Sequence, residues 1–174
     1  MTAQEIDNFL PDEYEIPASP SNYMKLQDGE NTFRVLSSAI VGWEYWNTEN
    51  KPVRMRKAPE NIPSDIRIDK GVVSKIKPFW AFIVWNYATK TIQILEITQK
   101  SIMGAIKSVV DNKKWGNPKG YDITITRMGE GLDTEYSTMP NPHSGVEDEV
   151  IEAFENKKVN LEALFEGKDP FASE

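Results

Sequence analysis

The sequence contains no cysteine, and His143 is its one histidine. Without thiols the chain can form neither disulfide bonds nor the thiolate zinc sites of small metal-binding domains. One histidine also leaves little material for imidazole metal ligation or for histidine-based catalysis. We therefore expect no metal, no cofactor and no enzymatic activity, and a chain without cysteine suits a reducing compartment.

Long apolar runs and an N-terminal targeting signal are also missing. No apolar run approaches the roughly 20 residues that a membrane-spanning helix needs. The first residues, MTAQEIDNFLPDEYEIP, are acidic, whereas a signal peptide starts with basic residues and continues with an apolar centre. These features predict a cytoplasmic protein without a membrane partner.

The charge is distributed unevenly along the chain. The net charge of −7 argues at first against a nucleic-acid partner, because contact with phosphates depends on Lys and Arg. Residues 1–21, however, hold five acids and no base, and residues 146–174 hold nine acids and three bases. Residues 51–77 hold eight bases and three acids. The chain therefore has a basic centre between acidic ends, which is either a phosphate-binding loop or a solvated loop of mixed charge.

The first half of the sequence predicts three strands. Residues 31–46 alternate apolar and strand-forming side chains and indicate a long first strand, bent near Gly42. The connection 47–77 contains three prolines and most of the basic charge, and a loop of that length is usually functional or disordered. Residues 77–87, KPFWAFIVWNY, predict the second strand, and the turn ATKT leads into a third at 92–97.

A helix and two further strands follow. The helix is expected to begin at Thr98 and to end before Trp115, because its apolar residues recur at the spacing of one buried helix face. These apolar residues are Ile102, Ala105, Ile106, Val109 and Val110. Residues 121–128 predict a fourth strand and residues 134–139 a fifth, after which Pro140 and Pro142 are expected to end the domain.

A last helix is expected near the C-terminus. Ser144 followed by Glu147 has the spacing of a capping box for a helix that continues to about Asn156. The residues expected to dock this helix on the body are Val146, Val150, Ala153 and Phe154.

Three strands, a helix and two further strands are the chain order of the OB fold, a five-stranded Greek-key barrel. We therefore expect a mainly β protein with an OB-fold barrel, a helix between strands 3 and 4, a C-terminal helix and an acidic tail. The expected divisions are an acidic N-terminal arm (1–24), an OB-fold nucleic-acid-binding domain (25–142) with its basic loop at about 47–77, the C-terminal helix (143–158) and the acidic tail (159–174).

The predicted strand 77–87 carries large aromatic rings on both faces, because Trp85 points one way and Trp80 the other. One face of a barrel strand lines the interior, so the other is available as a stacking surface. A two-residue turn at 88–89 would pair Trp85 with Ile92 and place that set in the core, whereas a three-residue turn would exchange the faces. The sequence leaves both registers open.

Chain order brings aromatic rings and positive charge close together. Single-stranded nucleic acid needs both, because bases stack on rings while Lys and Arg follow the phosphates. Packing in the core is the alternative role for any single ring. The candidate DNA-binding residues are Arg34, Trp43, Tyr45, Trp46, Arg54, Arg56, Lys57, Lys75, Lys77, Trp80, Trp85, Tyr87 and Arg127.

Four stretches resemble the phage-type single-stranded DNA-binding proteins, a family of helix-destabilising proteins with an OB-fold core. They are YMKLQDGENTFRVLSSAIVGWEYW, FWAFIVWNYATKTIQILEITQKSI, YDITITRMGEGLDTEYSTMP and LEALFEGKDPF. The resemblance implies single-strand binding with little sequence preference during phage DNA replication, recombination and repair, in the host cytoplasm.

The same resemblance implies an acidic C-terminal tail that recruits replication or recombination proteins, or competes with DNA for the basic cleft. Asp169, Pro170 and Phe171 look like the acidic residue, proline and aromatic at the tips of such tails. The alternative is that these residues pack as an apolar anchor. Three residues follow Phe171, and the cysteine-containing zinc subdomain of the larger phage proteins is absent, so no zinc role carries over.

A second interpretation belongs to a different class of protein. It is an OB-type protein-interaction module without nucleic-acid binding, in which the aromatic surface and the acidic ends both contact proteins. Salt-dependent oligonucleotide binding is expected only of the first interpretation.

The carboxylates Asp65 and Asp69 lie in a Lys-rich loop without a third ligand nearby, so we expect them to be solvated rather than part of a metal-dependent nuclease.

Overall fold

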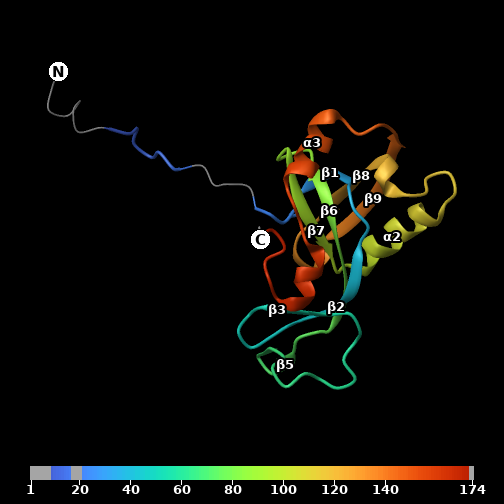
Figure 1. Cartoon of the computed structure of the whole chain (residues 1–174). Helices are drawn as coiled ribbons and strands as arrows, with labels where there is room; N and C mark the ends of the chain where they lie inside the picture. Colours follow the sequence, from blue (N-terminus) through green and yellow to red (C-terminus); the bar gives the residue numbers. More distant parts are fainter. Residues whose placement is uncertain (1–8, 17–20, 173–174) are drawn as a thin grey trace.

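The computed structural model describes residues 9–16 and 21–172 of the chain. This part is mainly β: seven strands form one antiparallel sheet, and two short strands form a separate hairpin (Figure 1). Neighbours in the sheet follow the order β3-β2-β6-β1-β8-β9, and β7 pairs with the other edge of β6. No helix in these two described ranges is long and apolar enough to cross a membrane.

The sheet strands are β1 (Gly29–Val35), β2 (Ile40–Trp46), β3 (Pro52–Met55), β6 (Lys77–Asn86), β7 (Thr91–Ile97), β8 (Tyr121–Met128) and β9 (Glu135–His143). The small hairpin is β4 (Ile68–Asp69) and β5 (Val72–Val73). The helices are α2 (Lys100–Asp111) and α3 (Asp148–Asn156), and the 3-10 helices are η1 (Pro118–Gly120), η2 (Gly131–Asp133) and η3 (Leu161–Glu166).

The predicted first strand is divided into β1 and β2, and the chain changes direction before Gly42. The Leu36 N–H donates to the carbonyl of Ile83 at 2.9 Å, and the Ile83 N–H donates to Ser37 Oγ at 2.8 Å. These bonds hold the break between the strands at residues 36–39. The bend expected at Gly42 is therefore wrong; at Gly42 the strand passes so close to its neighbours that an added Cβ would lie 2.3 Å from the Met55 carbonyl oxygen.

The connection 47–77 contains more regular structure than its sequence predicts. β3 pairs with β2, and an isolated bridge joins Asn47 to Ile66. In the β4–β5 hairpin, Lys70 and Gly71 have φ angles of 50° and 79°, as a two-residue type I′ turn requires. The connection therefore folds back onto the end of β2 and forms a small lobe below the sheet (Figure 1).

The β6–β7 hairpin has the register in which Trp85 pairs with Ile92, one of the two alternatives left open by the sequence. Residues 87–90 form the turn of this hairpin and connect Asn86 to its partner Thr91. The expected consequence, a core on one face and an exposed stacking surface on the other, is wrong. Both faces of β6 are covered, and from Phe79 onward only Trp80 remains half-buried.

The main core lies between the sheet and α2. It contains Phe33, Phe82, Val84 and Leu95 from the strands and Ile102 and Ile106 from the helix. The predicted helix is confirmed, with its start at Lys100 rather than at Thr98. Of the predicted face, Ile102 and Ile106 are buried and Ala105, Val109 and Val110 are half-buried, and Met103 is buried in addition.

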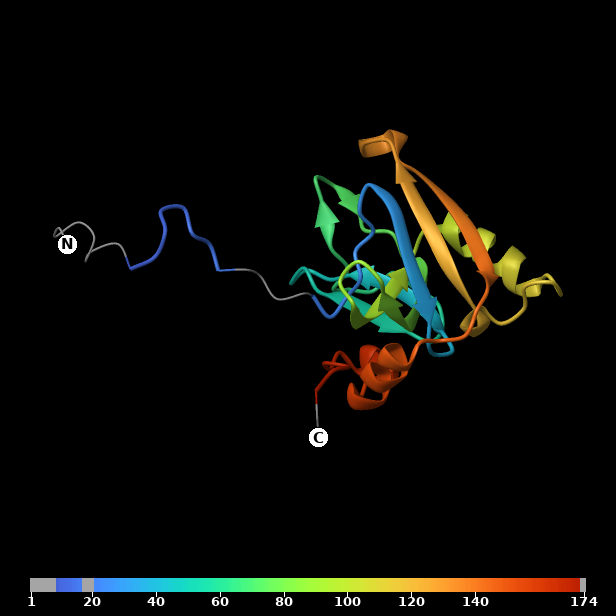
Figure 2. The ribbon, with the colours of Figure 1, turned by 90° about the horizontal axis from the view of Figure 1, so that it is seen from above.

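The opposite face of β6 and β7 is covered by the C-terminal segment, residues 144–172, which contains α3 and η3 (Figure 2). Ile83, Trp85 and Ile92 pack beneath Val150, and Phe79 and Ile94 pack beneath Leu164. The C-terminal helix is thus confirmed, and the residues expected to dock it are those that pack.

Two local expectations near the C-terminus are wrong. The helix α3 begins at Asp148, with Glu147 rather than Ser144 at the cap position, and no side-chain hydrogen bond caps it. The Ser144 hydroxyl accepts a hydrogen bond from Arg34 instead. β9 continues through Pro140 and Pro142 to His143. Prolines are tolerated there because β9 is an edge strand, which among residues 9–16 and 21–172 pairs in the sheet with β8 alone.

The free edge of β7 is covered by the end of the predicted N-terminal arm. The Met24 N–H donates to Ile94 O, and the Ile94 N–H donates to Asn22 O, both at 2.9 Å. Within the described residues, no pairing joins β7 to β9, so the sheet is open. Residues 22–24 belong to the body, and the side chain of Met24 is part of the main core.

Candidate nucleic-acid interface

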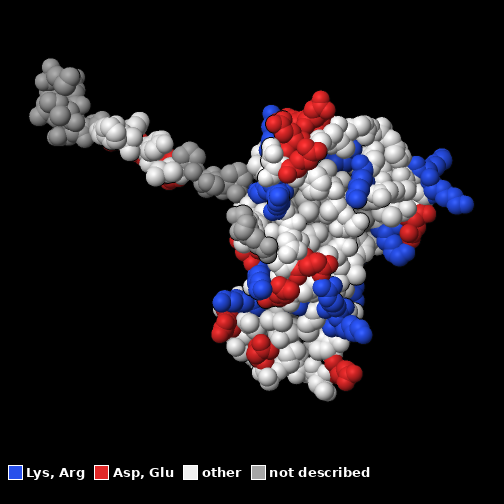
Figure 3. Space-filling model, in the orientation of Figure 1, with Lys and Arg blue, Asp and Glu red and all other residues white. Residues whose placement is uncertain are grey.

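A basic groove opens between the end of β2 and the β4–β5 hairpin. Its volume is about 630 Å³. We use the name basic groove for the space lined by Glu44, Trp46, Arg67, Asp69, Lys70, Val72, Val73, Ser74, Lys75, Lys77 and Thr98. Four bases and two acids line it, so the groove carries net positive charge. Lys and Arg side chains gather where the small lobe meets the sheet, interspersed with acidic side chains (Figure 3).

Trp46 supplies the aromatic surface of the basic groove. Its ring is 38% exposed, and the Arg67 guanidinium lies 5.8 Å from the ring centroid. The backbone fixes this pair, because the Arg67 N–H donates to Trp46 O at 2.8 Å. An exposed ring beside several cations can stack a base and contact neighbouring phosphates.

Three of the sequence-predicted residues, Trp46, Lys75 and Lys77, meet in this groove. Arg67 and Lys70 also line it, although sequence reasoning did not place them among the candidates. Both belong to the eight bases of residues 51–77. Their charge was visible in the sequence, but the hairpin that turns them toward Trp46 was not.

Arg54 and Arg56 contact carboxylates within the chain. Arg54 Nε lies 3.0 Å from Glu44 Oε2, and Arg54 Nη2 lies 2.6 Å from Glu96 Oε2. Arg56 forms an ion pair with Glu162, and its guanidinium lies 4.3 Å from the ring centroid of Phe165. Arg54 is therefore a half-buried structural cation, while Arg56 joins the basic loop to η3. Lys57 beside them is exposed.

The cluster of Glu44, Arg54 and Glu96 holds two carboxylates and one guanidinium. Burial raises the pKa of Glu44 to about 8, and the hydrogen bond and negative charge of Glu96 add to this effect, while Arg54 opposes it. Near neutral pH, Glu44 therefore keeps its proton, which removes one of the two negative charges beside Arg54.

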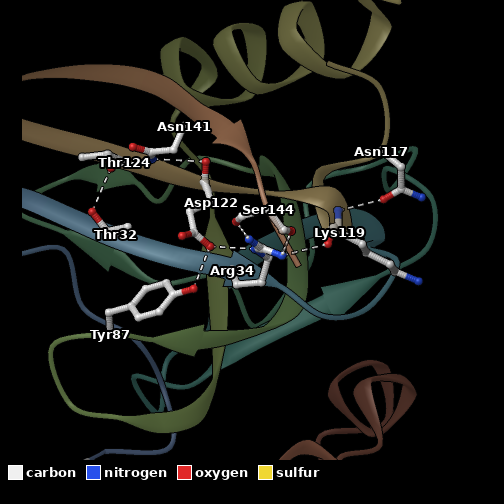
Figure 4. A network of polar contacts seen from close by, with 9 residues as sticks. All are labelled: Thr32, Arg34, Tyr87, Asn117, Lys119, Asp122, Thr124, Asn141 and Ser144. Carbon is white, nitrogen blue, oxygen red and sulfur yellow. Dashed lines mark hydrogen bonds and ion pairs between the residues drawn. The ribbon is translucent and has the colours of Figure 1, made fainter. Parts of the chain in front are cut away.

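Arg34 lies inside the protein, in the network shown in Figure 4. Its guanidinium donates to Asp122 Oδ1 at 2.6 Å, to Ser144 Oγ at 2.6 Å and to the carbonyls of Lys119 and Ser144. The side chain is 1% exposed. Arg34 thus joins β1, β8 and the start of the C-terminal segment, and its position does not allow the expected phosphate contact.

Tyr87 belongs to the same network. Its hydroxyl donates to Asp122 Oδ1 at 2.8 Å. Burial raises the pKa of Tyr87 to about 12, and the hydrogen bond to Asp122 contributes. The ring is 37% exposed, so one edge of Tyr87 remains at the surface.

The remaining predicted rings are covered to different degrees. Tyr45 is 5% exposed, and its hydroxyl donates to Asp65 Oδ1 at 2.7 Å. Burial raises the pKa of Tyr45 to about 12. Trp85 is 4% exposed beneath α3, so the prediction that it stacks on DNA conflicts with its position. Trp43 and Trp80 are half-buried, Trp43 beside Met55 in the β2–β3 pair.

Arg127 lies away from the basic groove, near the start of β1. Its Nη1 donates to Leu26 O at 3.3 Å, and its Nε lies 3.7 Å from Asp28 Oδ1. The side chain is 36% exposed. Arg127 is therefore available at the surface but is not brought together with the other candidates.

The predicted tip of the tail packs on the body. Pro170 is buried, and its carbonyl accepts a hydrogen bond from the Asn160 N–H at 2.8 Å. Phe171 packs edge-on against Tyr23, with 6.2 Å between the ring centroids, and Lys157 lies 4.9 Å from its centroid. Up to Ala172 the expected tail is therefore an anchored segment, as in the alternative interpretation of these residues.

Comparisons of the chain with family models, curated proteins and solved structures found no match. In the described ranges, no group of three or more His, Asp or Glu side chains is placed to hold a metal ion. Function is therefore inferred from the geometry and charge of the basic groove.

Proposed function

We propose that this chain is a non-enzymatic protein that binds single-stranded DNA without sequence preference. The observation that carries the proposal is the position of Trp46 among Arg67, Lys70, Lys75 and Lys77 in the basic groove. A ring and cations side by side suit a polymer with bases and phosphates in alternation. Because neither group reads base edges, binding depends little on sequence.

The core that carries this groove is proposed to be of the OB type. Its support is the order of the long elements: a divided first strand (β1 and β2), the β6–β7 hairpin, α2, then β8 and β9. β1 pairs with both β6 and β8, as the first strand of such a barrel does. The basic loop connects the first and second strands, a position that OB folds use for oligonucleotides.

The proposed biological setting is bacteriophage DNA replication, recombination and repair, in the host cytoplasm, as the family resemblance implies. The C-terminal segment is proposed to compete with DNA and to recruit replication or recombination proteins. Its acidic residue Glu162 already pairs with Arg56 of the basic loop. Part of the positive surface is therefore in contact with the segment expected to regulate it.

A titration of intrinsic tryptophan fluorescence with a dT oligonucleotide, at two salt concentrations, tests the proposal. Stacking on Trp46 is expected to quench emission, and added salt is expected to reverse it. Duplex DNA of equal length is the control and should quench much less. An absence of quenching, together with no complex in a gel shift, would refute the proposal.

Variants locate the interaction in the basic groove. Replacing both Lys75 and Lys77 with Ala should weaken binding at every sequence and reduce the salt slope by about 0.7 for each phosphate contact removed. Lys113→Ala with Lys114→Ala removes the same charge from the exposed loop after α2 and should leave the slope unchanged. Trp46→Leu should remove most of the quenching.

The second candidate function is an OB-type protein-interaction module. The observation that favours it is an apolar groove beside α2, lined by Val41 and Trp80 among others. Such a module would show no salt-dependent binding of the dT oligonucleotide, so the same titration distinguishes the two functions.

A further inference from the structure

An apolar groove of about 530 Å³ lies between α2 and the strands β2 and β6. It is lined mainly by Ala39, Val41, Trp80, Ile106, Val110 and Pro118. Val41 is 60% exposed, which places an apolar side chain in water at the mouth of the groove. The volume is in the range of grooves that hold ligands or short peptide segments.

Positive charge surrounds the apolar groove. Residues 100–119, from α2 to the start of β8, contain five lysines and one acid, Asp111. All five lysines are exposed. Lys107 and Lys119 line the groove itself, together with Asp111, which forms an ion pair with Lys107. Lys and Arg side chains gather over α2 and the loop after it (Figure 3). The groove is therefore suited to an apolar segment that carries negative charge.

Residues 9–16, FLPDEYEI, form such a segment in the same chain. Phe9 is 92% exposed and Ile16 is 85% exposed, while Leu10 and Tyr14 are about half exposed. Between these apolar residues stand three acids and no base. An exposed run of large apolar side chains is unfavourable in water and commonly marks a contact surface.

The segment and the groove lie on opposite sides of the molecule. Residues 9–16 extend away from the body, beyond the edge at which residues 22–24 pair with β7 (Figures 1 and 2). α2 lies on the far side of the sheet in both views. The segment therefore lies on the other side of the body from the groove of its own chain, where a second copy can contact it.

We infer that residues 9–16 of one copy dock in the apolar groove of a second copy. The apolar side chains of the segment cover Val41 and Trp80, and its acids face Lys107 and Lys119. The segment and the groove are different surfaces, so the contact is heterologous and each bound copy offers another groove. Association of this kind builds open chains or rings of copies. The contact needs no DNA and is independent of the proposed function.

Sedimentation of the full-length chain without DNA tests this inference. The wild-type chain should show a mass that rises above the monomer with concentration and falls again in high salt, since charge contributes to the contact. Phe9→Asp with Leu10→Asp alters the segment, and Val41→Glu alters the groove. Each variant alone should remain monomeric, but a mixture of the two should form a one-to-one complex, because one retains the groove and the other the segment.

Matched controls separate the groove from general effects of added charge. Ile68→Glu makes a comparable change at an exposed apolar residue of the β4–β5 hairpin, 61% exposed, and should associate like the wild type. If Val41→Glu does not fold, Lys107→Glu with Lys119→Glu replaces it as the groove variant. A monomeric wild-type chain, expected if the segment folded back on its own groove or bound a different protein, would overturn the inference. So would a mixture that forms no complex.

Discussion

At the scale of single residues, the cluster of Glu44, Arg54 and Glu96 connects three parts of the fold. Glu44 lies on β2, Arg54 on β3 and Glu96 on β7. The guanidinium is held by both carboxylates and lies 5.9 Å from the Phe79 ring centroid. A partly buried group with two carboxylates and one cation is stable when one carboxyl keeps its proton.

This arrangement gives a pH dependence with a definite sign. Since the pKa of Glu44 rises from 4.5 to about 8 in the folded protein, folding takes up a proton between these values. The contribution of Glu44 to the free energy of unfolding is fully present below about pH 4.5. It is lost as the pH rises through about 8.

Glu44→Gln should therefore remove part of this pH dependence, because glutamine stays neutral. We expect the variant to gain stability relative to the wild type as the pH rises from 4.5 to about 8. Urea unfolding at a series of pH values measures the difference between the two free energies of unfolding. Parallel curves for the two proteins across this window would contradict the assignment.

At the scale of elements, β2 is constrained where it pairs with β3 and contacts η3 of the C-terminal segment. Gly42 is the point of closest approach, since an added Cβ would lie 2.3 Å from Met55 O and 3.0 Å from a Phe165 ring carbon. Gly42→Ala forces β3 and η3 to shift, and we expect a loss of about 1–3 kcal/mol in the free energy of unfolding.

Gly104 in α2 is the matched control, because an added Cβ there meets nothing within 4 Å. Gly104→Ala should stabilise the protein by up to about 1 kcal/mol, since alanine favours an exposed helix position. Thermal unfolding of the two variants should give shifts of opposite sign. A Gly42→Ala variant as stable as the wild type would show that this crossing is not tightly packed.

The elements that the sequence predicts well are those with a local cause. α2 and β8 follow from apolar periodicity within their own residues, and the register of β6 and β7 was one of two alternatives. The break between β1 and β2 depends on bonds between residues 36–37 and Ile83, which are distant in the chain. β3 has four residues and is defined by its pairing with β2.

The candidate site was likewise predictable only where it does not depend on contacts between residues that are distant in the chain. The proximity of Trp46, Lys75 and Lys77 follows from chain order, whereas the burial of Trp85 depends on a helix that packs over it from the C-terminus. The interior position of Arg34 depends on Asp122 and Ser144, on two other elements. Residue type alone does not tell a buried arginine from one that contacts phosphate.

At the scale of the whole molecule, the acidic C-terminal segment covers one face of β6 and β7 and contacts the basic loop. Leu164 of η3 is buried on this face. Removing the segment would uncover Phe79 and Ile94, so a truncation mixes loss of charge with loss of packing. Competition between the segment and DNA is better tested by changing charge alone.

A variant that removes three negative charges combines Glu162→Gln, Glu166→Gln and Asp169→Asn. Glutamine and asparagine have nearly the same shape as the acids they replace, so the segment can remain packed. If the segment competes electrostatically, this variant should bind a dT oligonucleotide more tightly at low salt. The advantage should disappear at high salt, where exposed charges are screened. Fluorescence titration at several salt concentrations measures both effects.

The control neutralises three exposed acids of α3: Glu149→Gln, Glu152→Gln and Glu155→Gln. Both variants have the same net charge, so any difference between them reports position. Only the first set includes Glu162, the partner of Arg56. Tighter binding by the first set alone would place the competition at the contact between η3 and the basic loop. Equal gains would instead indicate a general effect of net charge, and no gain in either set would leave the C-terminal segment with a packing role.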